Sequence, residues 1–136
     1  MSAALRAVTA VLTNSATTNV LGLTIEAVPA YNGNHPRGTG NGYVLTIGGN
    51  RIYMTGDTGD IPEMHTLPDI DVAFVCVNVP FTMTVSDATN AVRAFRPGVV
   101  YPYHYRNQDG TLNNANSFKQ RFGTDLGIEV RLRKWY

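Results

Sequence analysis

A nearly unbroken apolar run over residues 71–77, Asp-Val-Ala-Phe-Val-Cys-Val, most constrains the fold of this chain. A strand with one face in water alternates apolar and polar residues, whereas a continuous apolar strand is covered on both faces. The run is followed by residues 86–95, in which Ala88, Val92 and Phe95 recur at helical spacing. The pattern predicts a buried strand followed by a helix, the unit from which α/β sheets are built.

The same alternation of strands and helices continues to the end of the chain. Ser86 is the predicted N-cap of the first long helix, because a serine hydroxyl accepts hydrogen bonds from the first helical turn. The Pro-Gly pair at 97–98 ends that helix. Residues 99–103 are predicted to form a strand, residues 115–122 a second helix and residues 128–132 a last strand.

The N-terminal part of the chain contains strands instead of long helices. Residues 21–28 are predicted to form a strand, and residues 29–41 a loop rich in Gly, Asn and Pro. Residues 43–54 are predicted to form a β-hairpin that turns at Gly48-Gly49-Asn50. A short helix is expected over residues 61–67. We therefore predict an α/β (α+β) fold with a mixed sheet, in one domain covering residues 1–136.

Composition limits the kinds of partner that the chain is expected to bind and the compartment in which it is expected to lie. A 136-residue chain with 43% hydrophobic and 15% charged residues is expected to fold as one globular domain. A formal net charge of +1 gives no electrostatic reason to bind nucleic acid or an anionic membrane. Residues 1–12 lack the apolar core of a signal peptide, and no apolar stretch approaches the roughly 20 residues that span a bilayer. The expected location is the cytoplasm. The single cysteine, Cys76, is predicted to be a buried structural thiol.

Four polar residues are candidates for chemistry, and each also has a plain structural explanation. Asp57 follows the hairpin in a Gly-Asp-Thr turn, where it could bind a metal ion or hydrogen-bond its own backbone. His104 follows the strand over residues 99–103, where it could be a ligand or a partly buried core residue. His35 lies in the Gly-rich loop and could simply be solvated. His65 is expected on the exposed face of the short helix.

A series of short segments carries a family resemblance when the segments are taken in order. They are 25–32, 35–38, 40–44, 51–53, 56–58, 61–64, 69–73, 81–83 and 99–105. The chain, over roughly residues 20–136, resembles the metallo-β-lactamase-fold hydrolases, in the branch related to ascorbate-phosphate lactonase. The resemblance implies that Asp57, in the Gly-Asp-Thr turn, bridges two metal ions and that His104 supplies a further ligand. It also makes His35 a candidate third ligand, and zinc, manganese or iron the candidate metals.

The chain departs from this family at the metal site. Proteins of this fold take several ligands from a His-x-His-x-Asp-His motif, and none of the three histidines of this chain belongs to such a motif. The resemblance therefore implies that the chain corresponds to the C-terminal half of a four-layer αββα sandwich. That half is a mixed sheet with helices on one face. A metal ion held by two or three side chains of one chain would be bound weakly.

Three functions remain open on this basis. The first is a truncated hydrolase-like domain with an incomplete metal site and little or no activity alone. Its uncovered sheet face would associate with a second copy to form a homodimer. The residues expected on that face are Val44, Ile52, Val75, Val77 and Val99.

The second is an active metal-dependent hydrolase of ester, lactone or phosphoester substrates. Its site would be completed across a dimer or by a second chain that carries the missing N-terminal half. The third is a binding or regulatory module with an unrelated small-molecule pocket.

Overall fold

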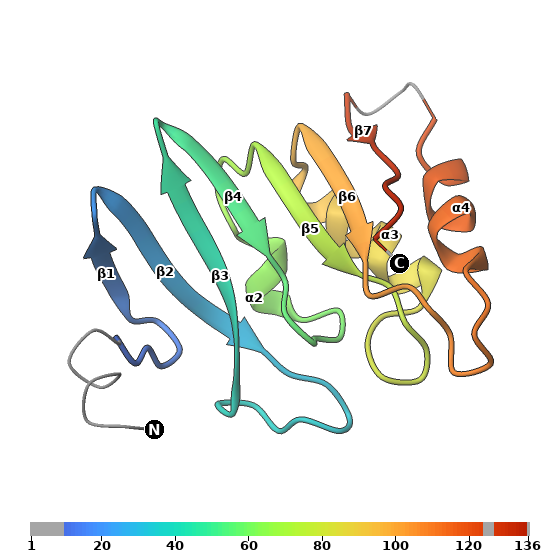
Figure 1. The fold of residues 1–136 in the computed structure, drawn as a ribbon, viewed down its shortest axis with the longest axis horizontal. Coiled ribbons are helices and arrows are strands. Elements are labelled where there is room, and N and C mark those ends of the chain that lie inside the picture. The colour runs from blue at the N-terminus through green and yellow to red at the C-terminus, as the bar shows by residue number, and fades with distance from the viewer. Residues whose placement is uncertain (1–9, 124–126, 136) are drawn as a thin grey trace.

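The computed structural model describes residues 10–123 and 127–135, and a seven-stranded mixed sheet forms its centre (Figure 1). The strands lie in the sheet in the order in which they occur along the chain. They are β1 (Thr17–Val20), β2 (Leu23–Ala30), β3 (Gly40–Ile47), β4 (Asn50–Met54), β5 (Val72–Cys76), β6 (Val99–Tyr103) and β7 (Glu129–Val130). Strands β1 to β4 are antiparallel, and β4 to β7 are parallel. The predicted α/β class with a mixed sheet is confirmed.

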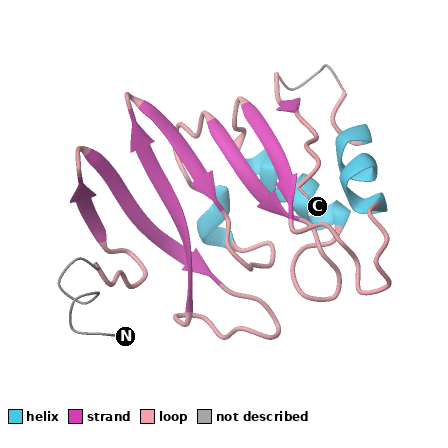
Figure 2. Cartoon of the chain, in the orientation of Figure 1, coloured by secondary structure: helices cyan, strands magenta, loops and turns pink. Residues whose placement is uncertain are grey.

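Helices lie in the connections between the parallel strands (Figure 2). Helix α2 (Pro62–His65) connects β4 to β5, α3 (Val85–Phe95) connects β5 to β6, and α4 (Asn113–Gln120) connects β6 to β7. Crossovers between parallel strands are right-handed, and the strand order never reverses here. Each helix is therefore carried to the same face of the sheet, as expected. None of the helices in residues 10–123 and 127–135 is long and apolar enough to cross a bilayer.

The hydrophobic core lies between the sheet and the helices. Strand register places Val44, Tyr53, Ala73 and Val100 side by side, and all four are fully buried. Helix residues from α2, α3 and α4, such as Phe118, belong to the same cluster.

The expectation that Val44, Val75 and Val77 lie on the uncovered face was wrong, because all three are buried in this core. Successive strand residues point to opposite faces. When a strand is apolar on both faces, its sequence does not show which of the two faces the helices cover.

None of the described helices lies on the other face of the sheet, and this face is rich in aromatic side chains. Ile52 and Val99 are half-buried on this face, as predicted. The rings of Phe74 and Tyr101 stack there with centroids 5.2 Å apart. Trp135 packs against both rings, at 6.3 and 6.5 Å, and its indole N–H donates to the Pro102 carbonyl at 3.0 Å. This surface, around Phe74, Tyr101 and Trp135, is called the open face below.

Several element boundaries differ from those predicted. Helix α3 is capped by Thr84 and not by Ser86: the Thr84 side chain accepts from the Asp87 N–H, and the Asp87 carboxylate accepts from the Thr84 N–H. Strand β1 occupies a polar segment for which no strand was predicted. Strand β7 is shorter than the predicted residues 128–132, and α4 begins two residues before the predicted position.

Candidate metal centre

Sheet topology brings Asp57 and His104 together. The carboxyl ends of parallel strands lie at one edge of a sheet, and Asp57 follows β4 while His104 follows β6. Only β5 separates these two strands. The His104 Nδ1 atom lies 3.1 Å from the Asp57 Oδ1 atom. Both side chains remain accessible to solvent, with exposed fractions of 36% for His104 and 50% for Asp57.

The turn that carries Asp57 is held by the residues on either side of it. Gly56 has a φ angle of +68°, and a Cβ atom at this position would lie 2.6 Å from the Asn41 carbonyl oxygen, so only glycine fits. The hydroxyl of the buried Thr58 donates to the Tyr31 carbonyl at 3.1 Å. The N–H of Cys76 donates to the Thr55 hydroxyl at 3.2 Å. The carboxylate of Asp57 is therefore presented from a rigid turn.

His104 sits at a sharp change of direction after β6. Its φ angle of +47° lies in the left-handed region, which non-glycine residues seldom adopt. The preceding carbonyl, that of Tyr103, accepts from the Val77 N–H at 3.3 Å and holds the end of β6 against β5. Burial raises the pKa of the Tyr103 phenol, and the charge of Asp57 contributes to the rise, so this hydroxyl keeps its proton beside the pair.

The loop that contains His35 is tied to the Asp57 turn through Asn32. The Asn32 amide donates to the Asp57 carbonyl at 3.0 Å, and its side-chain oxygen accepts from the His35 N–H at 3.0 Å. His35 itself is exposed. Within residues 10–123 and 127–135, no three His, Cys, Asp or Glu side chains are grouped closely enough to share a metal ion. The structure therefore brings Asp57 and His104 together and does not bring His35 to them.

Asn32 was not singled out from the sequence, although its position before Gly33 is typical of a residue that fixes a turn. The remaining histidine, His65, is exposed on α2, as predicted, and contacts the carboxylate of Asp60.

The donor chemistry of the pair suits a transition metal, but the number of donors does not complete a site. A carboxylate and an imidazole are both ligands of zinc, manganese and iron. Zinc sites in proteins use at least three protein ligands, and at this edge of the sheet the described residues offer two in contact, Asp57 and His104. The residues present therefore fit part of a metal centre and not a whole one.

An apolar pocket adjoins His104 on the open face. It has a volume of about 300 Å³ and is lined by Met54, Phe74, Tyr103, His104 and Trp135. Trp135 was not predicted to take part in any site. Its contribution arises because the residues after β7 continue alongside β6, so that the Trp135 ring reaches Tyr101 and Pro102, which periodicity along the sequence does not reveal.

Comparisons with known proteins agree with this architecture. The family model described as Beta-lactamase superfamily domain matches residues 2–104. A UPF0173 metal-dependent hydrolase from Thermococcus onnurineus is 32% identical over 131 residues, which are 90% of this chain and 58% of that protein. A UPF0173 metal-dependent hydrolase from Pyrococcus abyssi is 31% identical over 125 residues, covering 86% of this chain and 56% of the relative.

Solved structures of metal-dependent hydrolases are also similar to this chain. The crystal structure of a candidate metal-dependent hydrolase from Parabacteroides distasonis is 46% identical, with a TM-score of 0.76, and the match covers 90% of this chain and 56% of that chain. Igni18, a metallo hydrolase from Ignicoccus hospitalis, is 26% identical, with a TM-score of 0.77. The match covers 89% of this chain and 55% of the Igni18 chain. The chain thus spans about half the length of these relatives. It belongs to the metallo-β-lactamase superfamily, and its similarity within that superfamily is to the UPF0173 metal-dependent hydrolases.

Proposed function

We propose that this chain contributes Asp57 and His104 to the metal centre of a metal-dependent hydrolase, and that it has little or no hydrolase activity alone. One observation carries the proposal: a carboxylate and an imidazole 3.1 Å apart at the carboxyl edge of the sheet, with no third donor grouped with them among the described residues. The relatives named metal-dependent hydrolases support the class of reaction.

The incomplete donor set explains the expected lack of activity. A metal ion bound by two side chains exchanges readily with solvent, because affinity depends on the number of deprotonated ligands held in place. A zinc ion held in a complete site would supply a bound water of lowered pKa, and Asp57 and His104 would be two of the side chains that hold it. The remaining donors of the proposed centre come from outside the residues described.

The alternative function is an active hydrolase of ester, lactone or phosphoester substrates, completed across a dimer or by a second chain. The exposure of both side chains favours this possibility, because a second set of donors can approach them from solvent. In that assembly Asp57 and His104 keep the same role, and the second chain adds the missing ligands.

Zinc titration of the purified chain tests the two assigned donors. We expect weak binding to the wild type, measured by calorimetry, and a further clear loss in Asp57→Asn and His104→Gln. Asp69→Asn and His65→Gln are matched controls, because both residues are exposed and lie outside the pair. Zinc binding that is unchanged by both Asp57→Asn and His104→Gln would remove these residues from the proposed centre.

A further inference from the structure

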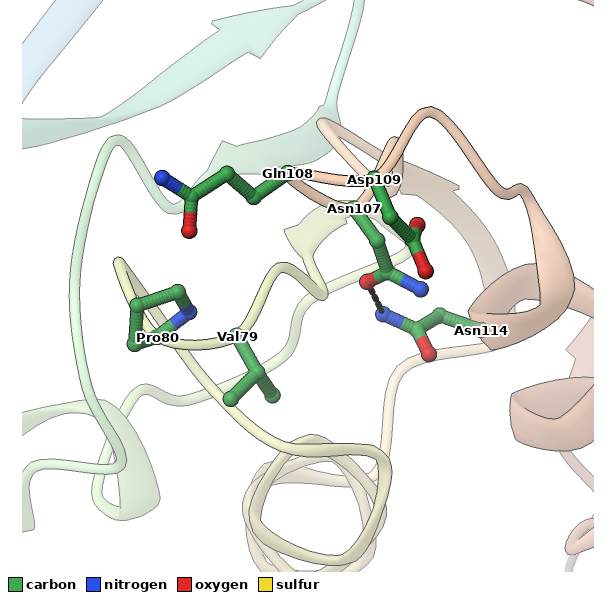
Figure 3. A pocket seen from close by; sticks show the side chains of 6 residues that line it. All are labelled: Val79, Pro80, Asn107, Gln108, Asp109 and Asn114. Carbon is green, nitrogen blue, oxygen red and sulfur yellow. Dashed lines mark hydrogen bonds between the residues drawn. The ribbon is translucent and has the colours of Figure 1, made fainter.

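A second, polar pocket opens at the same edge of the sheet as Asp57 and His104. Figure 3 shows it between the loop after β5, which contributes Val79 and Pro80, and the loop after β6. The polar lining residues are Asn107, Gln108, Asp109 and Asn114. Its volume is about 560 Å³, within the range of sites that hold small molecules.

Hydrogen bonds connect this pocket to the end of β6, which His104 follows. The Asn114 amide donates to the Val77 carbonyl at 3.1 Å, and the Val77 N–H donates to the Tyr103 carbonyl at 3.3 Å. Tyr103 immediately precedes His104. The wall of the pocket and the candidate metal ligand are therefore fixed to the same pair of strands.

The lining side chains are already partly ordered by bonds to one another. The Asn114 amide also donates to the Asn107 Oδ1 atom at 2.7 Å, so both of its N–H groups are used and its carbonyl oxygen is what it offers a ligand. Asn107 in turn donates to the Thr111 hydroxyl at 2.9 Å. Gln108 is exposed and can both donate and accept. Acceptors therefore dominate the free groups of the lining, so ligand groups that donate hydrogen bonds, such as hydroxyl groups, are suited to it.

The charge of the lining disfavours an anionic ligand. The N–H and hydroxyl of Thr111 both donate to the Asp109 carboxylate and lower its pKa, so Asp109 is ionised at neutral pH. None of the lining residues is basic. A phosphate group in this pocket would meet a fixed negative charge without a lysine or arginine of the lining to offset it.

We infer that the pocket lined by Asn107, Gln108, Asp109 and Asn114 binds an uncharged, hydroxyl-rich portion of the substrate. The apolar surface of Val79 and Pro80 would take the carbon skeleton of that portion, opposite the polar side chains (Figure 3). The inference rests on the proposed function, in that it assigns the pocket to the substrate of the Asp57–His104 centre. Within that function it favours a neutral ester or lactone over a phosphoester.

Nuclear magnetic resonance titration of the metal-free chain tests the pocket with two matched probes. Methyl β-D-glucopyranoside is uncharged, and glucose 6-phosphate has a similar ring with a phosphate. We expect saturable shifts of the Asn107, Gln108 and Asn114 side-chain amide signals with the glucoside. Glucose 6-phosphate should bind about fivefold more weakly, as expected for one like-charge contact near the surface.

Two variants and one control make the result specific. Gln108→Ala should weaken glucoside binding about threefold to tenfold, the effect of losing one hydrogen bond. Asp109→Asn should raise the affinity for glucose 6-phosphate to nearly that for the glucoside. Gln120 is an exposed glutamine on α4, and Gln120→Ala should change neither the affinity for the glucoside nor the affinity for glucose 6-phosphate.

The absence of saturable shifts, no effect of Gln108→Ala, or equal or tighter binding of glucose 6-phosphate to the wild type would overturn the inference. The titration contains no metal, so its failure is separate from a failure of the zinc experiment.

Discussion

At the scale of single residues, the placement of Asp57 depends on the glycine that precedes it. Gly56 combines a left-handed backbone with a close approach to the Asn41 carbonyl, so an added methyl group would meet backbone atoms that cannot move aside cheaply. Both effects act on the turn that presents the candidate metal ligand. A substitution at Gly56 should therefore affect both the stability of the fold and the position of Asp57.

We expect Gly56→Ala to lower the free energy of unfolding by about 2 kcal/mol or more, from backbone strain together with overpacking. Gly38→Ala is the control: its φ angle is +90°, but nothing lies within 4 Å of an added Cβ atom. Backbone strain alone should lower the free energy of unfolding of this variant by about 1 kcal/mol. Urea denaturation of both variants measures the difference, and equal losses would show that the Asn41 contact has no energetic effect.

The candidate ligands differ in how far the sequence could predict them. Asp57 and His104 follow strongly patterned strands, so their meeting at one sheet edge follows from the order of elements. His35 lies in a loop whose path depends on Asn32 and on the turn beneath it, and no periodicity encodes that path. Whether His35 lies close to the pair could therefore not be decided from the sequence alone, and among the described residues the structure does not group it with them.

At the scale of elements, helix α3 begins with a reciprocal pair of hydrogen bonds. Thr84 and Asp87 satisfy each other's backbone N–H groups, which places the start of the helix at Val85. Ser86 also has a side chain suited to capping, and the sequence alone does not decide between the two. The position of Asp87 three residues after Thr84 is the signal that distinguishes them.

Replacing Thr84 by alanine should lower the free energy of unfolding by about 1 kcal/mol, the usual effect of losing an N-cap. Ser86→Ala, within the first turn and exposed, should change it by less than about half that amount. Thermal unfolding followed by circular dichroism compares the two variants. A larger loss in Ser86→Ala would mean that the helix begins elsewhere.

The elements best predicted from the sequence are those with the clearest pattern, and the rest depend on tertiary contacts. The run around Phe74 predicted β5, and the stripe through Val92 predicted α3. Strand β1, by contrast, is polar and largely exposed, and it forms because Thr18 and Asn19 pair with β2 in register. The face of each strand that the helices cover was also undetermined, as Val75 shows.

At the scale of the whole molecule, helices α2, α3 and α4 cover one side of the sheet, and within residues 10–123 and 127–135 no helix covers the other side. The open face carries stacked aromatic rings, and Met54 and Trp135 on it are 42% and 46% exposed. Exposed apolar patches of this kind favour association. We therefore propose that a second copy of the chain covers the open face when the chain is isolated, forming a homodimer.

Sedimentation velocity at micromolar concentration tests this proposal. The wild type should sediment as a dimer, and Met54→Lys should shift it toward the monomer by placing a charge on the open face. Leu112→Lys is the matched control, because Leu112 is also 42% exposed but lies in the loop before α4. A monomeric wild type, or equal dissociation by both variants, would contradict the proposal.

The metal centre is the feature of the whole molecule on which the functional account depends. Two donors in contact, within a chain that spans about half the length of its relatives, predict a centre that one copy does not complete. The most direct test is the number of metal ions retained by each chain after zinc loading and exhaustive dialysis, measured by elemental analysis. We expect far less than one retained ion per chain. Two tightly held ions on a monomeric wild-type chain would contradict the account.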